Sequence, residues 1–321
     1  MDIFRKLEAA AKRKKRTIIL PESYDPRVIE AAKVILKKKL ANLILIDTGK
    51  SIKLPENDDL DIIDIEFSVQ FAEEYKKLRS KKIKGFALTD AEKALRDPLL
   101  FACMLLKNKY ADAVVAGSVY STGNVLRSAI QTVGLSKGNK TVSSFFLMSF
   151  PKAHKMADRV FAYGDCGVLP NPTAEQLSDI AIQTSLNFKK LTGIKPKTAF
   201  LSFSTKGSAK DASTEKVIKA MHLTRRRMPG LICDGEIQFD TAFVTEVAGR
   251  KDPKGKIKGD ANVFIFPDLN AGNIAYKITE RIGGAIATGP IVQGLALPVM
   301  DLSRGCNAND IVNMSIIASL Y

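Results

Sequence analysis

The chain has 321 residues, more than the roughly 250 at which single hydrophobic cores stop growing, so two α/β domains fit it better than one. It is 45% hydrophobic and has no low-complexity tract, which excludes an intrinsically disordered protein. The net charge of +15 fits a solvated basic surface, a nucleic-acid partner or a basic cleft for a small polyanion. Because the lysine runs at 11–16 and 36–40 lack interleaved aromatic residues, a nucleic-acid partner is not favoured.

Histidine and cysteine are too sparse for several kinds of site. With His154 and His222 as the only histidines, neither a histidine metal site nor a Ser-His-Asp triad is expected. The cysteines lie more than 60 residues apart, without the close pairing of a zinc site. We therefore expect reduced core residues and no disulfide at Cys103, Cys166, Cys233 and Cys306.

The N-terminal segment carries no recognisable targeting signal. It begins as a charged amphipathic helix and lacks the apolar core and small-residue cleavage site of a secretory signal. No uninterrupted apolar run reaches the length of about 18 residues that a membrane-spanning helix needs. We therefore expect a cytoplasmic protein.

The chain opens with a β-α-β pattern. Apolar runs at 16–20 and 40–47 predict buried strands, and apolar residues at helical spacing predict a helix over 25–39 between them. Acidic and apolar residues alternate over 59–66, which favours an exposed edge strand over a carboxylate metal site at Asp59 and Asp61.

Helices and strands alternate through the rest of the chain. Helical patterns at 68–80 and 97–110 precede an apolar strand at 111–117, and a new strand begins near 141. Repeated β-then-α units predict mainly parallel sheets covered by helices. In the second half, such strands and helices are expected over 174–193, 197–204, 214–223, 230–238 and 262–268.

The chain ends in an apolar helix, predicted over 310–321. Because a short terminal helix commonly packs back onto an earlier domain, we expect the C-terminal segment to complete the first domain. The predicted domains are 1–140 with 296–321, and 141–295. This division would put the stretch at 301–310 near the crossing between domains, where clefts form.

Two nucleotide-binding signatures are missing. No Gly-x-Gly-x-x-Gly fingerprint is present. The sequence DTGKS at 47–51 ends like a phosphate-binding loop, but Ile44 stands where the first glycine of that loop is required. Hydrolysis of nucleoside triphosphates is therefore not expected.

The stretch DLSRGCNAND at 301–310, just before the last helix, contains several residue types that can bind a ligand or take part in catalysis. Arg304 can hold a phosphate through two hydrogen bonds, Gly305 lets a ligand come close, and a helix start favours anions. The alternative is ordinary helix capping, in which Asn307 or Asn309 is the cap and Asp310 offsets the helix dipole. The stretch alone leaves both alternatives open.

Three other polar loops follow predicted strands, which is where open α/β sheets bind ligands. The loop at 117–129 contains Ser118 and Arg127, and the loop at 201–210 contains Lys206. The third loop, at 266–277, contains the candidate residues Asn270 and Gly272. Each loop alone fits a simple strand-to-helix turn, but together they predict a cleft for an anionic ligand.

Several segments together resemble the phosphate acetyltransferase (phosphotransacetylase) family in its short form. The resemblance covers essentially the whole chain in the expected order. It is carried by the loop with Arg127 and by the segments PNPTAEQLSDIA, LSFSTKGSAK, CDGEIQFD, FPDLNAGNIAYK and DLSRGC with the aspartate that follows.

The resemblance implies a fold and an activity. The expected fold is two α/β domains with mainly parallel sheets and a cleft between them, as in isocitrate and isopropylmalate dehydrogenases. The expected reaction interconverts acetyl phosphate and coenzyme A with acetyl-CoA and phosphate, by direct thiol attack in a ternary complex. It implies no metal and no tightly bound cofactor, and a homodimer. Phosphate butyryltransferase is the alternative, and a non-enzymatic basic protein that binds nucleic acid is a remote one.

The resemblance also implies roles for individual residues. Arg304 and Arg127 would hold acetyl phosphate and stabilise the charge that develops on it. Ser303 would donate a hydrogen bond in the transition state, and Asp310 would accept the proton of the coenzyme A thiol. Arg79 would contact coenzyme A. The remaining predicted substrate-binding residues are Gly305, Ser118, Asn270, Gly272 and Lys206.

Asp310 faces an energetic difficulty as the base. Ordinary thiols and aspartates have pKa values of about 8.5 and 3.9, a mismatch on the order of 6 kcal/mol. Proton transfer to Asp310 therefore requires burial of the carboxyl, cations that stabilise the thiolate, or both.

Some positions depart from the family pattern. Leu297 and Met300 replace a lysine and an asparagine beside the active loop, which puts the acyl chain and the coenzyme A contacts in question. Ser128 follows Arg127 where proline is usual. Cys306 is expected to pack rather than to carry an acyl group.

Overall fold

The computed structural model describes residues 3–50 and 52–321. The chain folds into two compact units, which we name after their sheets. The five-stranded unit comprises Phe4–Lys137 and Leu295–Tyr321, and the six-stranded unit comprises Ile3 and Gly138–Gly294. The predicted boundaries between independently folding domains stay a prediction. Met1 and Asp2, at the start of the first predicted domain, and Ser51, the end of the DTGKS segment, lie outside the described residues.

The five-stranded unit is built on a parallel sheet with the strand order β11-β4-β1-β2-β3. The acidic and apolar segment near 60 forms β3 at the sheet edge, so that prediction is confirmed. The strands are β1 (Thr17–Leu20), β2 (Asn42–Asp47), β3 (Leu60–Asp64), β4 (Ala113–Ala116) and β11 (Val299–Asp301).

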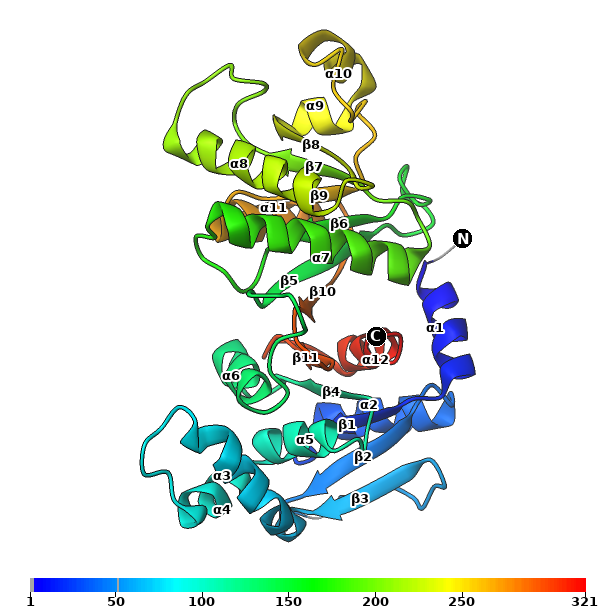
Figure 1. The fold of residues 1–321 in the computed structure, drawn as a ribbon. Helices are drawn as coiled ribbons and strands as arrows, with labels where there is room; N and C mark the ends of the chain where they lie inside the picture. The colour runs from blue at the N-terminus through cyan, green and yellow to red at the C-terminus, as the bar shows by residue number, and fades with distance from the viewer. Residues whose placement is uncertain (1–2, 51) are drawn as a thin grey trace. The chain divides into compact units, whose positions relative to one another are not determined.

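Helices cover this sheet. The C-terminal helix α12 packs against α2, β4 and β11 (Figure 1). The other helices include α5 and α6, which pack against each other and contribute to one apolar core with Ile19, Ile44 and Val114. The helices are α1 (Ile3–Lys14), α2 (Pro26–Lys37), the 3₁₀ helix η1 (Ile65–Phe71), α3 (Ala72–Ser80), α4 (Leu88–Leu95), α5 (Pro98–Lys107), α6 (Thr122–Thr132) and α12 (Ala308–Ala318).

Two helices of this unit begin with the same local signal. In α2, the carboxylate of Asp25 accepts a hydrogen bond from the N–H of Arg27, and Pro26 occupies the first helical position. In α5, Asp97 caps the helix in the same way and a proline again follows. An aspartate cap satisfies helix N–H groups that lack intrahelical partners, and proline suits a position that needs no N–H donor. These starts place the loops that precede both helices.

The six-stranded unit has the strand order β10-β5-β6-β9-β7-β8. Strands β6, β9, β7 and β8 are parallel to one another, whereas β5 runs antiparallel to both β10 and β6. The prediction of mainly parallel sheets is therefore confirmed, with β5 as the exception. The strands are β5 (Ser143–Ser149), β6 (Phe161–Gly164), β7 (Lys197–Leu201), β8 (Ile232–Ile237), β9 (Val263–Ile265) and β10 (Ile286–Gln293).

The longest helix of this unit is α7. Thr173 and Gln176 form a capping box at its start, and Gly193, with a positive φ of 74°, ends it. Phe264 lies in an aromatic core with Tyr163 and Phe161. The helices are α7 (Ala174–Thr192), α8 (Ala212–Arg227), α9 (Phe239–Phe243), α10 (Thr245–Lys251) and α11 (Leu269–Arg281).

Membrane-spanning helices and metal-binding clusters are absent from the described residues. No helix among them is long and apolar enough to cross a membrane. No group of three or more histidine, cysteine or acidic side chains in residues 3–50 and 52–321 is arranged to hold a metal ion, and Asp59 instead pairs with Lys15 at 2.7 Å. The four cysteines are free and buried.

Candidate active site

The candidate site of the five-stranded unit lies at the carboxyl ends of two neighbouring strands. Strands β4 and β11 are parallel, with Asp301 opposite Ala116 in register. The loops that follow them, 117–121 and 302–307, therefore leave the same edge of the sheet. These two loops, with the helices that they begin, carry most of the residues predicted for the site.

A buried carboxylate organises the first loop. Glu22 is 1% exposed, and its Oε2 accepts hydrogen bonds from the N–H groups of Gly117 (3.0 Å) and Ser118 (2.9 Å). Its Oε1 accepts from the N–H groups of Val119 (2.8 Å) and Tyr120 (2.9 Å). A cluster of converging backbone N–H groups is an anion site. Here the anion is part of the protein, so these amides are already occupied.

Ser118 takes part in the same arrangement. Its side chain is buried, and its hydroxyl donates to Oε2 of Glu22 at 2.7 Å. The hydroxyl therefore fixes the loop. The predicted contact between Ser118 and substrate stays a prediction.

Arg27 connects the two loops. Its Nη2 donates to the carbonyl oxygen of Ser118, and its Nη1 donates to the carbonyl oxygens of Arg304 and Cys306, each at 2.8 Å. Its guanidinium also bonds both carboxylate oxygens of Asp25. Burial opposes ionisation of Asp25, but the hydrogen bonds from Arg27 outweigh burial and hold the pKa of that carboxyl below its usual range. Arg27 thus fixes the main chain of the second loop from within the unit.

The second loop presents three of the predicted residues. Ser303, Arg304 and Gly305 are exposed in the turn, where the Ser303 hydroxyl accepts a hydrogen bond from the N–H of Gly305 at 3.2 Å. Within the part of the chain that the structure describes, the Arg304 guanidinium makes no hydrogen bond or ion pair. Its main chain is held while its cation stays available for a ligand.

Helix capping is present beside this turn. Oδ1 of Asn307 accepts the N–H of Asp310, and Oδ2 of Asp310 accepts the N–H of Asn307, both at 3.0 Å. The helix begins at Ala308, two residues before the predicted start. The capping alternative is thus realised through Asn307 rather than Asn309, and the Asp310 carboxylate is exposed rather than buried.

Cys306 fits a packing role. Its side chain is buried, and burial raises the pKa of the thiol to about 11. The charge of Arg27 opposes this shift, and the charges of Asp310, Asp25 and Glu22 add to it. At neutral pH the thiol is therefore protonated, whereas acyl transfer to a cysteine needs the thiolate.

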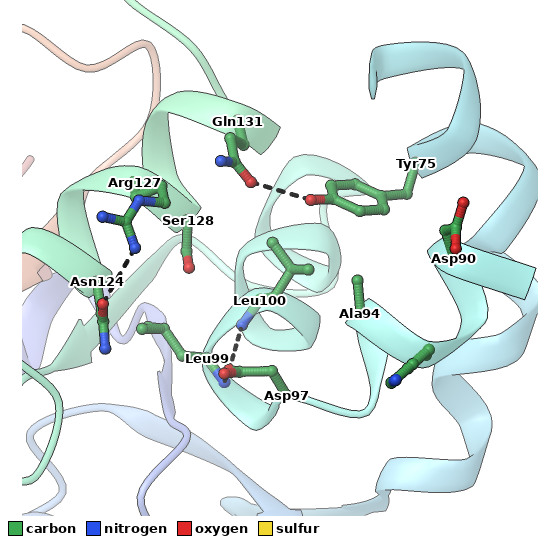
Figure 2. A pocket seen from close by; sticks show the side chains of 11 residues that line it. Tyr75, Asp90, Ala94, Asp97, Leu99, Leu100, Asn124, Arg127, Ser128 and Gln131 are labelled. Carbon is green, nitrogen blue, oxygen red and sulfur yellow. Dashed lines mark hydrogen bonds between the residues drawn. The ribbon is translucent and has the colours of Figure 1, made fainter. Parts of the chain in front are cut away.

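Arg127 lies at a pocket on the helical side of this unit. Figure 2 shows Arg127, Asn124 and Gln131 of α6 on one side of the pocket and Tyr75 of α3 on another. The pocket has a volume of about 540 Å³. Arg127 is exposed, and its Nη1 donates to Oδ1 of Asn124 at 3.3 Å. Ser128, which departs from the family pattern, also lines the pocket.

Arg79 lies near this pocket without lining it. It is half-buried at the end of α3. Burial raises the pKa of the Tyr75 hydroxyl, which lines the pocket, and the charge of Arg79 opposes that shift. The positive charge of Arg79 therefore affects the pKa of a residue that lines the pocket.

The other predicted residues belong to the six-stranded unit. The ammonium group of Lys206 pairs with Asp234 and lies 3.5 Å from Oδ2 of Asp252. Asp234 is 1% exposed; burial opposes its ionisation, but the hydrogen bond from Lys206 helps to hold the pKa of its carboxyl below the usual range. Lys206 thus neutralises buried acids of its own unit, and its predicted contact with substrate stays a prediction.

Asn270 and Gly272 lie in the first turn of α11. Asn270 is exposed. A Cβ atom at Gly272 would lie 2.3 Å from the carbonyl oxygen of Asp165, so glycine is required for the helix to approach the segment after β6. Gly272 therefore has a packing role, whatever its relation to substrate.

Sequence reasoning missed Glu22 and Arg27. Both lie in the segment PESYDPR at 21–27, whose only sequence signal is the Asp25-Pro26 helix start. The loop partners of Arg27 lie 91 to 279 positions away. A charged pair beside a strand end is the signal that was available, but it does not identify the partners.

Comparison with known proteins identifies the family. The family model described as "Phosphate acetyl/butaryl transferase" matches residues 2–319. A phosphate acetyltransferase of Acetivibrio thermocellus is 47% identical over 325 residues, which cover 100% of this chain and 98% of that protein. A phosphotransacetylase structure from Streptococcus pyogenes has a TM-score of 0.91 at 36% identity, covering 99% of this chain and 97% of that chain.

A more distant likeness concerns the fold alone. A structure assigned to a 4-hydroxythreonine-4-phosphate dehydrogenase from Salmonella typhimurium has a TM-score of 0.52 at 11% identity, covering 96% of this chain and 99% of that chain. The predicted α/β class with its dehydrogenase-like architecture is confirmed at this level. The match over the full length is decisive for the family: this chain belongs to the phosphate acetyl/butaryl transferase family and is an acyltransferase.

Proposed function

We propose that the chain catalyses the reversible transfer of an acetyl group between acetyl phosphate and coenzyme A. One observation carries the proposal: the Arg304 cation is exposed on a turn whose main chain is fixed by Arg27. The exposed carboxylate of Asp310 follows in the first turn of the next helix. An exposed cation on a fixed turn, followed by an exposed carboxylate, suits an anionic acyl donor and a thiol acceptor. The phosphate acetyltransferase names of the relatives support the same reaction.

The chemistry balances without a further reagent. Asp310 accepts the proton of the coenzyme A thiol, and the sulfur forms a bond to the carbonyl carbon of acetyl phosphate. The bond from that carbon to the phosphate oxygen then breaks, and phosphate leaves with the electron pair. Arg304 and Arg127 stabilise the negative charge on the carbonyl oxygen and on the leaving phosphate, while Ser303 donates a hydrogen bond.

The exposure of Asp310 decides between the two requirements for proton transfer from the thiol, which are burial of the carboxyl and stabilisation of the thiolate by cations. Burial by the surrounding chain does not supply the match, because the carboxylate is exposed. The second alternative, stabilisation of the thiolate by nearby cations, is therefore favoured, and Arg304 and Arg127 are the candidates.

We assign acetyl rather than butyryl transfer, because relatives at 47% and 43% identity are named phosphate acetyltransferase. Of the two departures beside the active loop, Met300 is fully buried in β11 and Leu297 packs against the apolar core of the unit. Both differences from the family pattern therefore lie in packing positions rather than on the exposed turn.

A thioester absorbance assay tests the reaction. With coenzyme A in excess, acetyl phosphate should give a higher kcat/KM than butyryl phosphate. A preference for butyryl phosphate would replace the assignment with the alternative activity, and no thioester from either donor would contradict acyl transfer to coenzyme A.

Arg79 is proposed to bind coenzyme A through charge. Arg79→Ala should raise the KM for coenzyme A about tenfold and change kcat little, because a remote cation contributes equally to ground-state and transition-state binding. Initial rates with varied coenzyme A measure this. Lys77→Ala, which removes an exposed cation from the same helix, should have no effect on that KM. Equal effects of the two variants would indicate only general charge attraction.

The cytoplasmic location and the homodimer also remain proposals. A homodimer is supported by three exposed isoleucines at spacings of four residues on and just after α11. Their exposures are 56% at Ile274, 52% at Ile278 and 83% at Ile282. A row of this kind suits a self-complementary interface. Light scattering of the purified chain measures the assembly, and a monomer mass would contradict it.

A further inference from the structure

Asp301 is a buried carboxylate at the edge of the candidate site. It is the last residue of β11 and is 0% exposed. Its Oδ2 accepts a hydrogen bond from Oγ1 of Thr122 at 2.6 Å. Its Oδ1 is buried and has no hydrogen-bond partner among the described residues, since the nearby N–H of Leu302 donates to Ala116 at 2.8 Å.

The fold reserves space for this carboxylate. Gly117, which follows β4, has a φ of +108°. A Cβ atom there would lie 2.6 Å from Oδ1 of Asp301 and 2.6 Å from the N–H nitrogen of Leu302. A side chain at residue 117 is therefore excluded both by backbone conformation and by contact. The close approach brings the ends of β4 and β11 together around the Asp301 side chain.

Keeping an acid at this position is unfavourable. Burial, and to a lesser extent the charge of Glu22, raises the pKa of Asp301 to about 7; the hydrogen bond from Thr122 and the nearby N–H of Leu302, whose hydrogen bond goes to Ala116, oppose the shift. A buried carboxylate with one unpaired oxygen costs free energy that a neutral side chain of similar size would avoid. Local arrangements that cost stability concentrate at functional sites.

We propose that Asp301 is a positioning residue whose hydrogen bond to Thr122 holds the Ser303–Arg304 turn against the start of the helix that carries Arg127. Thr122 is the first residue of α6, and Arg127 follows on the same helix. Ser303 and Arg304 follow Asp301 directly after Leu302. One hydrogen bond thus joins the two main-chain segments that bear the proposed phosphate-binding arginines. The inference rests on the proposed function, because its consequence is read in acetyl transfer.

The first test replaces the donor of this hydrogen bond. Thr122→Val removes the hydroxyl and keeps the branched shape, whereas Thr122→Ser keeps the hydroxyl and serves as the matched control. The valine variant should lose about tenfold or more in kcat, because small displacements of reacting groups are costly. Its KM for coenzyme A should change little, and the serine variant should stay within about twofold of the parent.

A double-mutant cycle separates positioning from general destabilisation. If Asp301→Ala, which removes the acceptor that an asparagine would keep, and Thr122→Val act through one hydrogen bond, the double variant should lose no more kcat than the worse single variant. Multiplying losses would overturn the inference, as would a valine variant that has a lower melting temperature but the parent kcat. If Asp301→Ala does not fold, the comparison of valine with serine at residue 122 still decides. An inactive parent chain would instead contradict the proposed function.

Discussion

Asp310→Asn should lower kcat by roughly 100-fold or more and leave the KM values for both substrates nearly unchanged, the effect expected for loss of a general base. An amide does not accept the thiol proton at neutral pH, but its oxygen still accepts a hydrogen bond from the N–H of Asn307. The capping box seen at the start of α12 is therefore largely preserved in this variant. Steady-state rates with both substrates varied separate kcat from the two KM values.

A capping variant provides the matched control. Asn307→Ala removes the oxygen that accepts the N–H of Asp310 and leaves the Asp310 carboxylate in place. It should cost about 1 kcal/mol of unfolding free energy and keep most of the activity. The opposite pattern would contradict the proposed base: if Asp310 only offsets the helix dipole, Asp310→Asn loses at most about 1 kcal/mol of stability and stays fully active.

The secondary structure of the five-stranded unit could be predicted because its signals are local. The apolar runs that became β1 and β2, and the Asp-Pro start of α2, depend on residues within a few positions of one another. Strand direction is not local. The run at 143–149 became β5, which is antiparallel to both neighbours, and only its pairing with β10 and β6 decides that direction.

The same distinction between local and long-range signals applies to the candidate site. The turn with Ser303 and Arg304 could be singled out from sequence because its residues are contiguous, although the stretch alone left helix capping open as the alternative. The groups that fix the turn could not, because Arg27 reaches it across 277 positions. Lys206 shows what a local pattern leaves out: a lysine in a polar loop suggests a ligand contact, which stays a prediction, but its pairing with the distant, buried Asp234 could not be predicted.

In both units a buried acid of the protein accepts hydrogen bonds from a cluster of backbone N–H groups, which limits the groups left to bind a phosphate. In the six-stranded unit, Oδ1 of Asp165 accepts the N–H of Gly167 and Oδ2 accepts the N–H of Leu169, both at 2.9 Å. Burial outweighs these hydrogen bonds and raises the pKa of Asp165. Glu22 fills the amides after β4 in the same manner. Because both clusters of N–H groups are occupied by acids of the protein, they do not compete with the arginine side chains that we propose to bind the substrate phosphate.

Arg304→Ala should therefore damage acetyl phosphate binding and turnover together. We expect kcat/KM for acetyl phosphate to fall by about 10²–10³, with kcat lowered and KM raised, because the guanidinium is proposed to contact the phosphate in both the ground and transition states. The loop itself should persist, since Arg27 holds residue 304 through its main-chain carbonyl oxygen, which alanine keeps. Rates with varied acetyl phosphate at saturating coenzyme A measure both constants.

Two further variants identify what the arginine supplies. Arg304→Lys keeps the charge but not the planar fork of donors, so it should recover only part of the lost kcat/KM. Arg226→Ala removes another exposed cation, from α8, and should leave the kinetics unchanged, which controls for net charge. An alanine variant with the parent KM for acetyl phosphate would show that the phosphate is bound by other groups. Full recovery by lysine would reduce the role of Arg304 to a point charge, whereas partial recovery is the result that two directed hydrogen bonds to the phosphate require.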